Sequence, residues 1–562
     1  MTFWESMHKK SFLYYALSVF LLYIVFLTVK PLLRSGYYPM HDDIQPIRLL
    51  ELDKCVRDLQ IPCRWVPDMG YGYGYPQFNY YAPMPYYVME IFHLIGFGIL
   101  ASIKIYLVLI TILSIWGFYK LSAKFWQSDL AGFISALFYS LLPYRAVNLY
   151  VRGAVGEYTA QALIPLILLF SYSLIQGKKK INILYFSLSL AFLLLSHTIS
   201  AVMFTLFLIV WLIFIYKLDK NPKKLILSLK KIWLSLLGVA TLTAFFILPA
   251  LFERGFIHGD TLTSNYFDFR GHFLGIYQIL FSNNWGYGSS LPGPNDQIML
   301  GIGVMYWFTS LIAFIIGMIL KKKRMFLLFL NLLAWTALFL THSKSAILWN
   351  NLPFMDYFQF PWRFNALAGI FFSLTVGYFA IISVSNYFKS VIIIFFTVIL
   401  LIFYGRFFRP DKWLNLTDND KLSGKNWDLA TTISINDYLP IYTNLSPAKK
   451  ALDKPEVISG KVNFINVEKG TNWQKWSLFA SDNSVIQAQL FYFPNWKLYV
   501  DGKDTLIDYK DHNGLITFNV QKGMHALDLR LTDTPIRTMG NVITLLGFPA
   551  FLFIYHKYKY EE

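Results

Sequence analysis

Two carboxylates and an imidazole stand side by side in the segment YYPMHDDIQPIRLLELDKC, directly after the first hydrophobic run of the chain. They belong to His41, Asp42 and Asp43. A carboxylate in a cleft can take the proton of a hydroxyl group while that hydroxyl attacks a carbon atom. Adjacent carboxylates alternate sides, so only one of the two needs to face such a cleft. The simpler alternative is that these side chains are solvated loop residues.

Other residues could complete a site around these carboxylates. Arg152, His197 and Arg363 could hold an anionic leaving group such as a phosphate. Glu157 could be a second acid or base, or it could be the partner that neutralises Arg152. Arg363 could equally be an interfacial anchor beside Trp362.

The sequence lacks the motifs of several other classes of enzyme. We find no P-loop, HExxH or CxxC motif, and GYGYG at 70–74 is followed by proline and aromatic residues rather than by a helix. Cys55 and Cys63 could form a disulfide outside the cytoplasm, but we favour free thiols because Cys55 lies on a helix with apolar periodicity. The ligand set is inadequate for zinc. A divalent cation, Mg²⁺ or Mn²⁺, at Asp42 and Asp43 stays open.

The elements that must position these residues are membrane helices. Of the 562 residues, 56% are hydrophobic and 15% are charged, whereas a soluble domain carries about 25% charged residues. Many runs approach the ~20 apolar residues that a spanning helix needs, and the first is too long for a signal peptide, which predicts an uncleaved span. The predicted spans are 11–33, 104–121, 129–146, 158–176, 181–196, 199–216, 232–250, 298–320, 325–341, 362–384, 389–407 and 538–556.

The charge distribution predicts how the chain is oriented. The net charge is +17, but Lys and Arg gather in short loops such as 177–180 and 321–324, which indicates membrane topology rather than a nucleic-acid partner. The segment 83–100 is short and contains Glu90 and His93, so we predict an interfacial helix. The large basic loops and both termini then lie in the cytoplasm. The segments that face outward are 34–103, 251–297 and 408–537.

The segment 408–537 is long enough to form a domain. Apolar runs of period two, broken by turn residues, predict strands at 484–493, 496–500, 504–508, 514–520 and 524–532. We expect an antiparallel β-sandwich at about 455–535. The predicted organisation is therefore a transmembrane domain at 1–407 with its first outer loop at 34–103, an outer domain at 408–537, and a last span with a cytoplasmic tail at 538–562.

This topology brings polar motifs from three loops and several helix ends to one membrane face, as expected for a cleft built by several helices. The first outer loop resembles that of the GT-C superfamily, the polytopic glycosyltransferases that use polyprenyl-phosphate sugars. More closely, MHDD…RLLEL…DLQIPCRWVPDMGYGYGYPQFNYYAPMPYYV resembles the bacterial and archaeal membrane proteins labelled 6-pyruvoyl-tetrahydropterin synthase-related. The segment FYFPNWKLYVDGK…NGLITFNVQKGMHALDLRLTDTPIR is similar to the outer C-terminal domain of YfhO-type membrane proteins.

The resemblance implies a GT-C-like fold of about 12 spans plus interfacial helices. It implies transfer of a sugar from a polyprenyl-phosphate donor to a glycan, lipid or protein acceptor on the outer face of the cytoplasmic membrane. Asp42 or Asp43 then takes the place of the catalytic aspartate of the superfamily. Glu157 and Arg152 lie where related enzymes often keep a second acidic residue.

Aromatic residues of the first outer loop suit either sugar stacking or an interfacial belt. We favour the belt for most of them and keep Tyr75 and Tyr80 as substrate-binding candidates. Two other functions stay open. A transporter or flippase for a lipid-linked glycan would need charged groups near the bilayer midplane, and the predicted spans have almost none. A non-catalytic envelope protein would use its β-sandwich to bind glycan.

Overall fold

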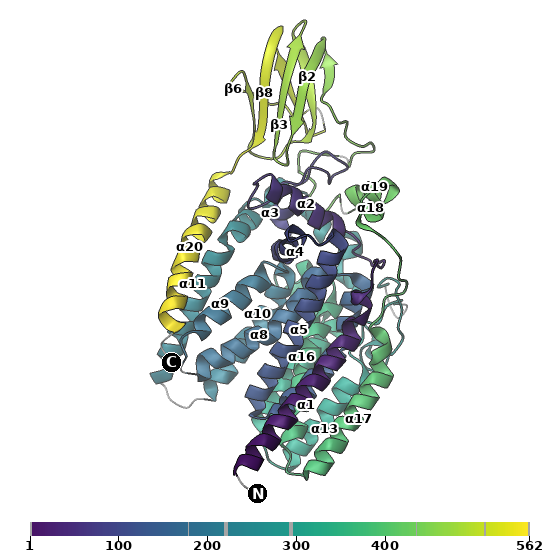
Figure 1. The fold of residues 1–562 in the computed structure, drawn as a ribbon, viewed down its shortest axis with the longest axis vertical. Coiled ribbons are helices and arrows are strands. Elements are labelled where there is room, and N and C mark those ends of the chain that lie inside the picture. Colours follow the sequence, from purple (N-terminus) through teal and green to yellow (C-terminus); the bar gives the residue numbers. More distant parts are fainter. Residues whose placement is uncertain are drawn as a thin grey trace.

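The structure is a computed structural model that describes residues 3–177, 179–218, 223–291, 296–433, 435–444, 446–510 and 513–559. A bundle of long helices carries a β-sheet domain at one end (Figure 1). Helix α1 (Phe3–Val29) begins at the opposite end of the bundle, and α20 (Pro535–Lys559) runs away from the β domain along one flank (Figure 1). The predicted class, a polytopic helical membrane protein with a C-terminal β domain, is therefore confirmed.

Long apolar helices make up the bundle. Within the described residues, nine helices are long and apolar enough to span a membrane, and a bent pair of helices raises the number to as many as ten. Two shorter apolar helices occupy the remaining predicted runs. The principal helices of the nine spans are α1 (Phe3–Val29), α5 (Ile99–Trp126), α8 (Val155–Gln176), α10 (Thr198–Lys217), α11 (Lys223–Phe252), α14 (Arg324–Thr341), α16 (Asn365–Val376), α17 (Asn386–Tyr404) and α20 (Pro535–Lys559). The bent pair is α6 (Asp129–Ser140) with α7 (Pro143–Ala146) and η2 (Val147–Arg152), and the short helices are α9 (Asn182–Leu194) and α13 (Val304–Ile319).

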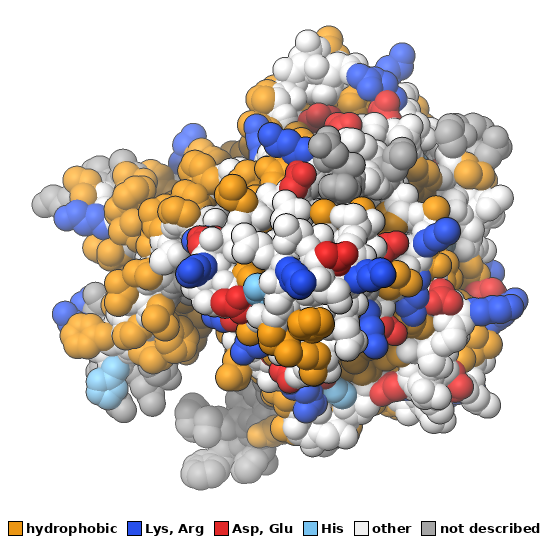
Figure 2. Space-filling view, turned by 90° about the horizontal axis from the view of Figure 1, so that it is seen from above, with side chains coloured by type: hydrophobic (Ala, Val, Ile, Leu, Met, Phe, Trp, Pro, Cys, Tyr) orange, Lys and Arg blue, Asp and Glu red, His pale blue; other side chains and the backbone are white. Residues whose placement is uncertain are grey.

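The outer surface of the bundle exposes large apolar side chains, as a lipid environment requires. Helices α11 and α20 pack side by side at one flank of the bundle (Figure 1). On them Trp233 is 62% exposed and Leu545 is 73% exposed. Figure 2 looks onto the end with the β domain, where this flank is mostly hydrophobic while Lys, Arg, Asp and Glu side chains mix over the rest. An exposed apolar area of this extent marks a membrane-facing surface.

The segment 83–100 does not form a membrane-length helix. Helix α4 (Met84–Leu94) has 11 residues, about half of the ~20 that cross a bilayer. Its inner face buries Tyr86 and Met89, while Ile91 on the other face is 57% exposed. This division of the two faces supports an interfacial position for α4.

The two cysteines form a disulfide, Cys55 to Cys63, so our preference for free thiols is wrong. Helix α2 (Gln45–Arg57) ends two residues after Cys55, and the chain turns back at Leu59, whose φ is +57°. This turn brings the two Cα atoms to 5.6 Å, within the usual range for a disulfide.

The β domain consists of two antiparallel sheets around one core. One sheet has the order β2-β3-β8-β5-β6, and the other has the order β1-β4-β7. Trp476 of one sheet stacks on Phe518 of the other with ring centroids 5.7 Å apart, and both are buried. The strands are β1 (Glu456–Ser459), β2 (Val462–Lys469), β3 (Trp473–Ala480), β4 (Ser484–Phe491), β5 (Trp496–Val500), β6 (Lys503–Thr505), β7 (Leu515–Val520) and β8 (Gly523–Leu531).

The β domain is fixed onto the first outer loop by both apolar and polar contacts. Trp65 is fully buried and contacts Phe493 and Trp496, with ring centroids 5.8 and 5.7 Å away. The Asp58 carboxylate accepts a hydrogen bond from the Thr471 backbone N–H at 2.6 Å. Because burial of one large apolar side chain stabilises by about 1.5–3 kcal/mol, Trp65 contributes to the attachment of the β domain to the first outer loop.

A substitution in α4 tests how the burial of Glu90 affects the stability of the protein. Glu90 is 2% exposed, and burial, reinforced by the nearby Asp53, raises the pKa of Glu90 to about 8. The fold favours the uncharged form of the Glu90 carboxyl group. The stability that this preference contributes is therefore complete below pH 4.5 and is lost as the pH rises through about 8. We expect Glu90→Gln to raise the apparent thermal midpoint in detergent at about pH 9 and to leave it unchanged at about pH 4.

The control for this test is Asp453→Asn, because the Asp453 side chain is fully exposed. That variant should follow the wild-type midpoint at both pH values. Equal midpoints for Glu90→Gln and the wild-type chain at high pH would show that Glu90 is solvated in the folded protein.

Candidate active site

A buried ion cluster surrounds Glu157 in the first turn of α8, where the helix dipole favours a negative charge. Its Oε2 atom lies 2.6 Å from Nη1 of Arg152 and 3.3 Å from Nε of Arg363. Its Oε1 atom accepts hydrogen bonds from the Tyr144 hydroxyl at 2.5 Å and the Asn148 amide at 3.3 Å. Glu157 therefore has a positioned partner on each oxygen.

The buried part of the cluster has two positive charges and one negative charge, and Asp42 adds a second carboxylate at its exposed edge. Arg152 and Arg363 are both at least 92% buried, and they share the single carboxylate of Glu157. The Arg152 guanidinium lies over the ring of Trp362, 4.7 Å from its centroid. Because an unbalanced buried charge is costly, two guanidinium groups around one carboxylate create a favourable place for a further anion.

Backbone hydrogen bonds attach the His-Asp-Asp segment to this cluster. The His41 N–H donates to the carbonyl of Val151 at 3.0 Å, and the Asp42 N–H donates to the carbonyl of Arg152 at 2.8 Å. The chain can approach this closely because Gly153, with a φ of +64°, has no side chain, and a Cβ atom there would lie 2.1 Å from the sulfur of Met40. The end of η2 thus holds the motif in place.

The two aspartates have different surroundings. Asp42 is exposed and interacts electrostatically with Arg152 and Arg363. Asp43 is partly buried, and its Oδ2 atom accepts a hydrogen bond from Nζ of Lys421 at 2.5 Å. Burial raises the pKa of Asp43, although Lys421 opposes this rise. Asp42 is therefore the solvent-exposed carboxylate of the two, whereas Asp43 ties the motif to the segment that precedes the β domain.

A hollow lies next to His41. The Nε2 atom of His41 is 2.9 Å from the carbonyl oxygen of Tyr287. Tyr287 lines a hollow of about 400 Å³, and the whole lining consists of Asn283, Asn284, Trp285, Tyr287, Arg406 and Arg409. The His-Asp-Asp motif consequently stands between the buried ion cluster and a polar, aromatic hollow.

His197 contributes to the cluster as a neutral ring. It precedes α10, and its Nδ1 atom accepts the backbone N–H of Ser200 at 3.1 Å. Burial, together with the positive charge of Arg363, lowers the pKa of His197 to about 3. At physiological pH the ring is uncharged, so it can offer a phosphate an N–H donor but not a positive charge.

Tyr75 and Tyr80 do not join the cluster. The hydroxyl oxygen of Tyr75 accepts the backbone N–H of Tyr438 at 2.8 Å, and the Tyr80 hydroxyl donates to the carbonyl of Glu253 at 2.7 Å. The Tyr80 ring also stacks on Tyr438, with centroids 5.8 Å apart. Tyr80 also contacts Phe493, which follows β4, with ring centroids 6.3 Å apart, whereas the ring of Tyr75 lies 5.9 Å from that of Tyr438.

A divalent cation finds few ligands at this site. The ranges that the structure describes contain no group of three or more His, Cys, Asp and Glu residues that could hold a metal ion. Because the Asp43 carboxylate bonds Lys421, Asp42 and Asp43 do not offer a joint carboxylate pair. Because Mg²⁺ often binds one or two carboxylates together with a substrate phosphate, the divalent cation that the sequence left open stays a prediction.

Some members of the site escaped prediction from the sequence. Tyr144 and Asn148 bind Glu157 directly. The spacing of Asn148 and Arg152, which are four residues apart on one helical face, is the sequence signal that could have indicated that these two side chains lie close together. Lys421 lies in α18 (Asp418–Lys421), far along the chain from Asp43, and no local pattern connects the two.

These features define a class: an integral membrane protein with several apolar helices, a β-sheet domain at one end and a buried ion cluster near the junction. The chain belongs to the family described as "6-pyruvoyl-tetrahydropterin synthase related domain; membrane protein", whose model matches residues 78–407. This match confirms the resemblance to that family. The matched region contains Glu157 and Arg363 but begins after Asp42 and Asp43.

Individual proteins resemble the chain over parts of its length. An uncharacterized protein of Lactococcus lactis subsp. cremoris (strain MG1363) is 25% identical over 261 residues, which cover 44% of this chain and 41% of that protein. Among solved structures, arabinofuranosyltransferase AftD from Mycobacteria is similar with a TM-score of 0.45 and 14% identity, over 71% of this chain and 27% of AftD. The oligosaccharyltransferase AglB from Archaeoglobus fulgidus is similar with a TM-score of 0.42 and 14% identity, over 72% of this chain and 57% of AglB. The family assignment rests on the family model.

The ion cluster predicts a large effect of one conservative substitution. Glu157→Gln keeps the size of the side chain but leaves two buried guanidinium groups without their carboxylate. Removing one partner of a buried ion pair costs about 3–5 kcal/mol, so we expect a clearly lower apparent thermal midpoint in detergent. The double variant Glu157→Gln/Arg363→Gln should lose less than the sum of the two single variants, because the residues interact directly.

Glu456→Gln is the matched control, since Glu456 is exposed on β1, and its midpoint should not change. A wild-type midpoint for Glu157→Gln, or additive losses in the double variant, would contradict the buried ion cluster.

Proposed function

We propose that this protein is a glycosyltransferase of the GT-C type that uses a polyprenyl-phosphate sugar as donor. One observation carries the proposal: the exposed carboxylate of Asp42 is held by its backbone at the edge of a buried cluster in which two guanidinium groups share the carboxylate of Glu157. A base and an anion site next to each other are the two groups that transfer from a phosphate-linked sugar needs.

Asp42 serves as the general base in this proposal. It takes the proton from an acceptor hydroxyl as that oxygen forms a bond to the anomeric carbon of the sugar. The bond between this carbon and the phosphate oxygen breaks, and its electron pair stays on the leaving polyprenyl phosphate. Asp43 does not take part, because its carboxylate is bonded to Lys421.

Arg152 and Arg363 stabilise the charge that develops on the phosphate. Each guanidinium has five N–H donors in a planar fork, and Glu157 engages only part of them. Glu157 fixes the direction of both guanidinium groups, and the neutral ring of His197 offers a further N–H donor. The hollow beside His41, with the amides of Asn283 and Asn284, gives room and hydrogen-bonding groups for the sugar.

The cluster and the β domain are proposed to face the outside of the cytoplasmic membrane. The distribution of Lys and Arg in short loops supports this orientation, and α1 begins at the end of the bundle remote from the β domain (Figure 1). The lipid-linked donor would then enter from the outer leaflet, and the acceptor would be a glycan, lipid or protein outside the cell. No step passes through a metal ion.

Two aspartate variants test the catalytic assignment. The full-length protein in nanodiscs is assayed for transfer from a panel of radiolabelled polyprenyl-phosphate sugars. We expect Asp42→Asn to lower transfer by at least about 100-fold, the contribution of a general base. Asp43→Asn should retain transfer within about tenfold of the wild-type rate but should lower the thermal midpoint, since it weakens the bond to Lys421.

Asp453→Asn, on the exposed surface, is the control and should transfer as the wild-type chain does. Wild-type transfer by Asp42→Asn would exclude Asp42 as the base. A loss confined to Asp43→Asn would give the role to the other carboxylate and contradict the assignment made here.

A further inference from the structure

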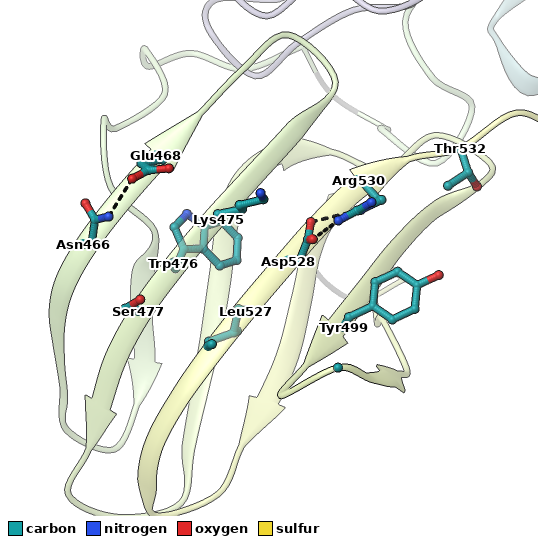
Figure 3. A pocket seen from close by; sticks show the side chains of 12 residues that line it. Asn466, Glu468, Lys475, Trp476, Ser477, Tyr499, Leu527, Asp528, Arg530 and Thr532 are labelled. Carbon is teal, nitrogen blue, oxygen red and sulfur yellow. Dashed lines mark hydrogen bonds and ion pairs between the residues drawn. The ribbon is translucent and has the colours of Figure 1, made fainter.

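The β domain carries a polar groove remote from the ion cluster. The groove lies on the outer face of the five-stranded sheet, has a volume of about 740 Å³ and crosses strands β2, β3, β8 and β5 (Figure 3). Four neighbouring strands span about 14 Å, because strands lie ~4.8 Å apart. The groove is therefore long enough for an oligosaccharide rather than for a single sugar.

The register of the strands aligns one row of functional groups across the sheet. Glu468 pairs with Lys475, Lys475 pairs with Asp528, and Asp528 pairs with Tyr499. Small side chains occupy the neighbouring positions, because Ser477 pairs with Ala526 in the same register. Long side chains beside small ones produce the hollow, and Figure 3 shows Lys475, Asp528 and Tyr499 on neighbouring strands.

The ion pairs and hydrogen bonds of the groove run along the strands. The amide of Asn466 donates to Glu468 at 2.8 Å on β2, and Arg530 forms an ion pair with Asp528 on β8. The Nζ atom of Lys475 lies 5.5 Å from the ring centroid of Trp473 on its own strand. Opposite charges that face each other across strands also stabilise a sheet, as Lys475 does between Glu468 and Asp528. The contacts along β2 and β8 add to this, and a hollow of about 740 Å³ lies over the row.

The chemistry of the lining selects a neutral carbohydrate. Glu468 and Asp528 balance Lys475 and Arg530, so the groove lacks the surplus positive charge that a polyanion would require. Carboxylate, amide, ammonium and guanidinium groups match the donor and acceptor capacity of sugar hydroxyls. Tyr499 adds a flat apolar face with a polar hydroxyl, and the Arg530 guanidinium lies 6.0 Å from the centroid of its ring.

We propose that this groove is a non-catalytic binding site for a neutral glycan chain. Its lining residues are separate from Asp42, Glu157 and the two arginines of the transfer site. The site therefore binds glycan whether or not the protein transfers sugar. In a transferase it would hold the extracellular glycan near the outer end of the bundle.

The test measures binding of the full-length protein in nanodiscs to immobilised oligosaccharides. The probes are neutral hexose and pentose oligosaccharides and one oligomer of uronic acid. We expect a neutral oligosaccharide to bind the wild-type chain, and we expect Tyr499→Ala and Arg530→Ala to weaken this binding by at least about tenfold. Ala526→Trp, which fills the hollow from an exposed position, should abolish it.

The matched control is Phe479→Ala. Phe479 is a 43% exposed aromatic residue on β3 that points from the same face of the sheet outside the groove, so its loss should not change binding. Asp42→Asn should also bind as the wild-type chain does, which separates the groove from the transfer reaction. The proposal is overturned if no neutral oligosaccharide binds, if the uronic acid oligomer binds more tightly, or if the groove variants bind no more weakly than Phe479→Ala.

Discussion

A single buried carboxylate, Glu157, organises the bundle around the candidate site. It draws together Arg152 from the end of η2 and Arg363 from the turn before α16, and it also binds the side chains of Tyr144 and Asn148. In a medium of low dielectric constant, neither the carboxylate nor the guanidinium groups can lose a partner without a large cost. This requirement fixes the end of η2, and it thereby positions the His-Asp-Asp motif, because the Asp42 N–H donates a hydrogen bond to the carbonyl of Arg152.

The β domain depends on the bundle in a different way. Its position is set by aromatic packing against Trp65 and by hydrogen bonds from the carboxylate of Asp58. At the other side, Arg537 at the start of α20 forms a buried ion pair with Glu253 at the end of α11. The first outer loop thus provides both the Asp42 segment beside the ion cluster and the Asp58 and Trp65 contacts with the β domain.

The sequence predicted the helices better than it predicted the site. Hydropathy located every apolar run, because a span needs a length of apolar residues that few other structures require. Strands β4 to β8 followed from alternating residues and turn signals. Strands β1, β2 and β3 were not predicted. The register of β2 against β3 shifts between Phe464 and Asn466, and such a shift interrupts the alternation that a pattern search detects.

The parts of the site that the sequence did not predict depend on contacts between segments that are distant in the chain. Glu157 was identified with Arg152, its neighbour in the chain, but the pair with Arg363 arises only when α8 meets the turn before α16. The partner of Asp43 lies in α18, so the sequence left both aspartates equivalent. The disulfide depends on the turn at Leu59, and apolar periodicity around Cys55 carries no information about that turn.

The most direct test of this account is a cryo-EM structure of the full-length protein in nanodiscs with a bound polyprenyl phosphate. The account predicts density for the phosphate within hydrogen-bonding distance of Arg152 or Arg363 and beside the carboxylate of Asp42. A phosphate bound at the end of the bundle where α1 begins, or out of reach of both arginines, would contradict it.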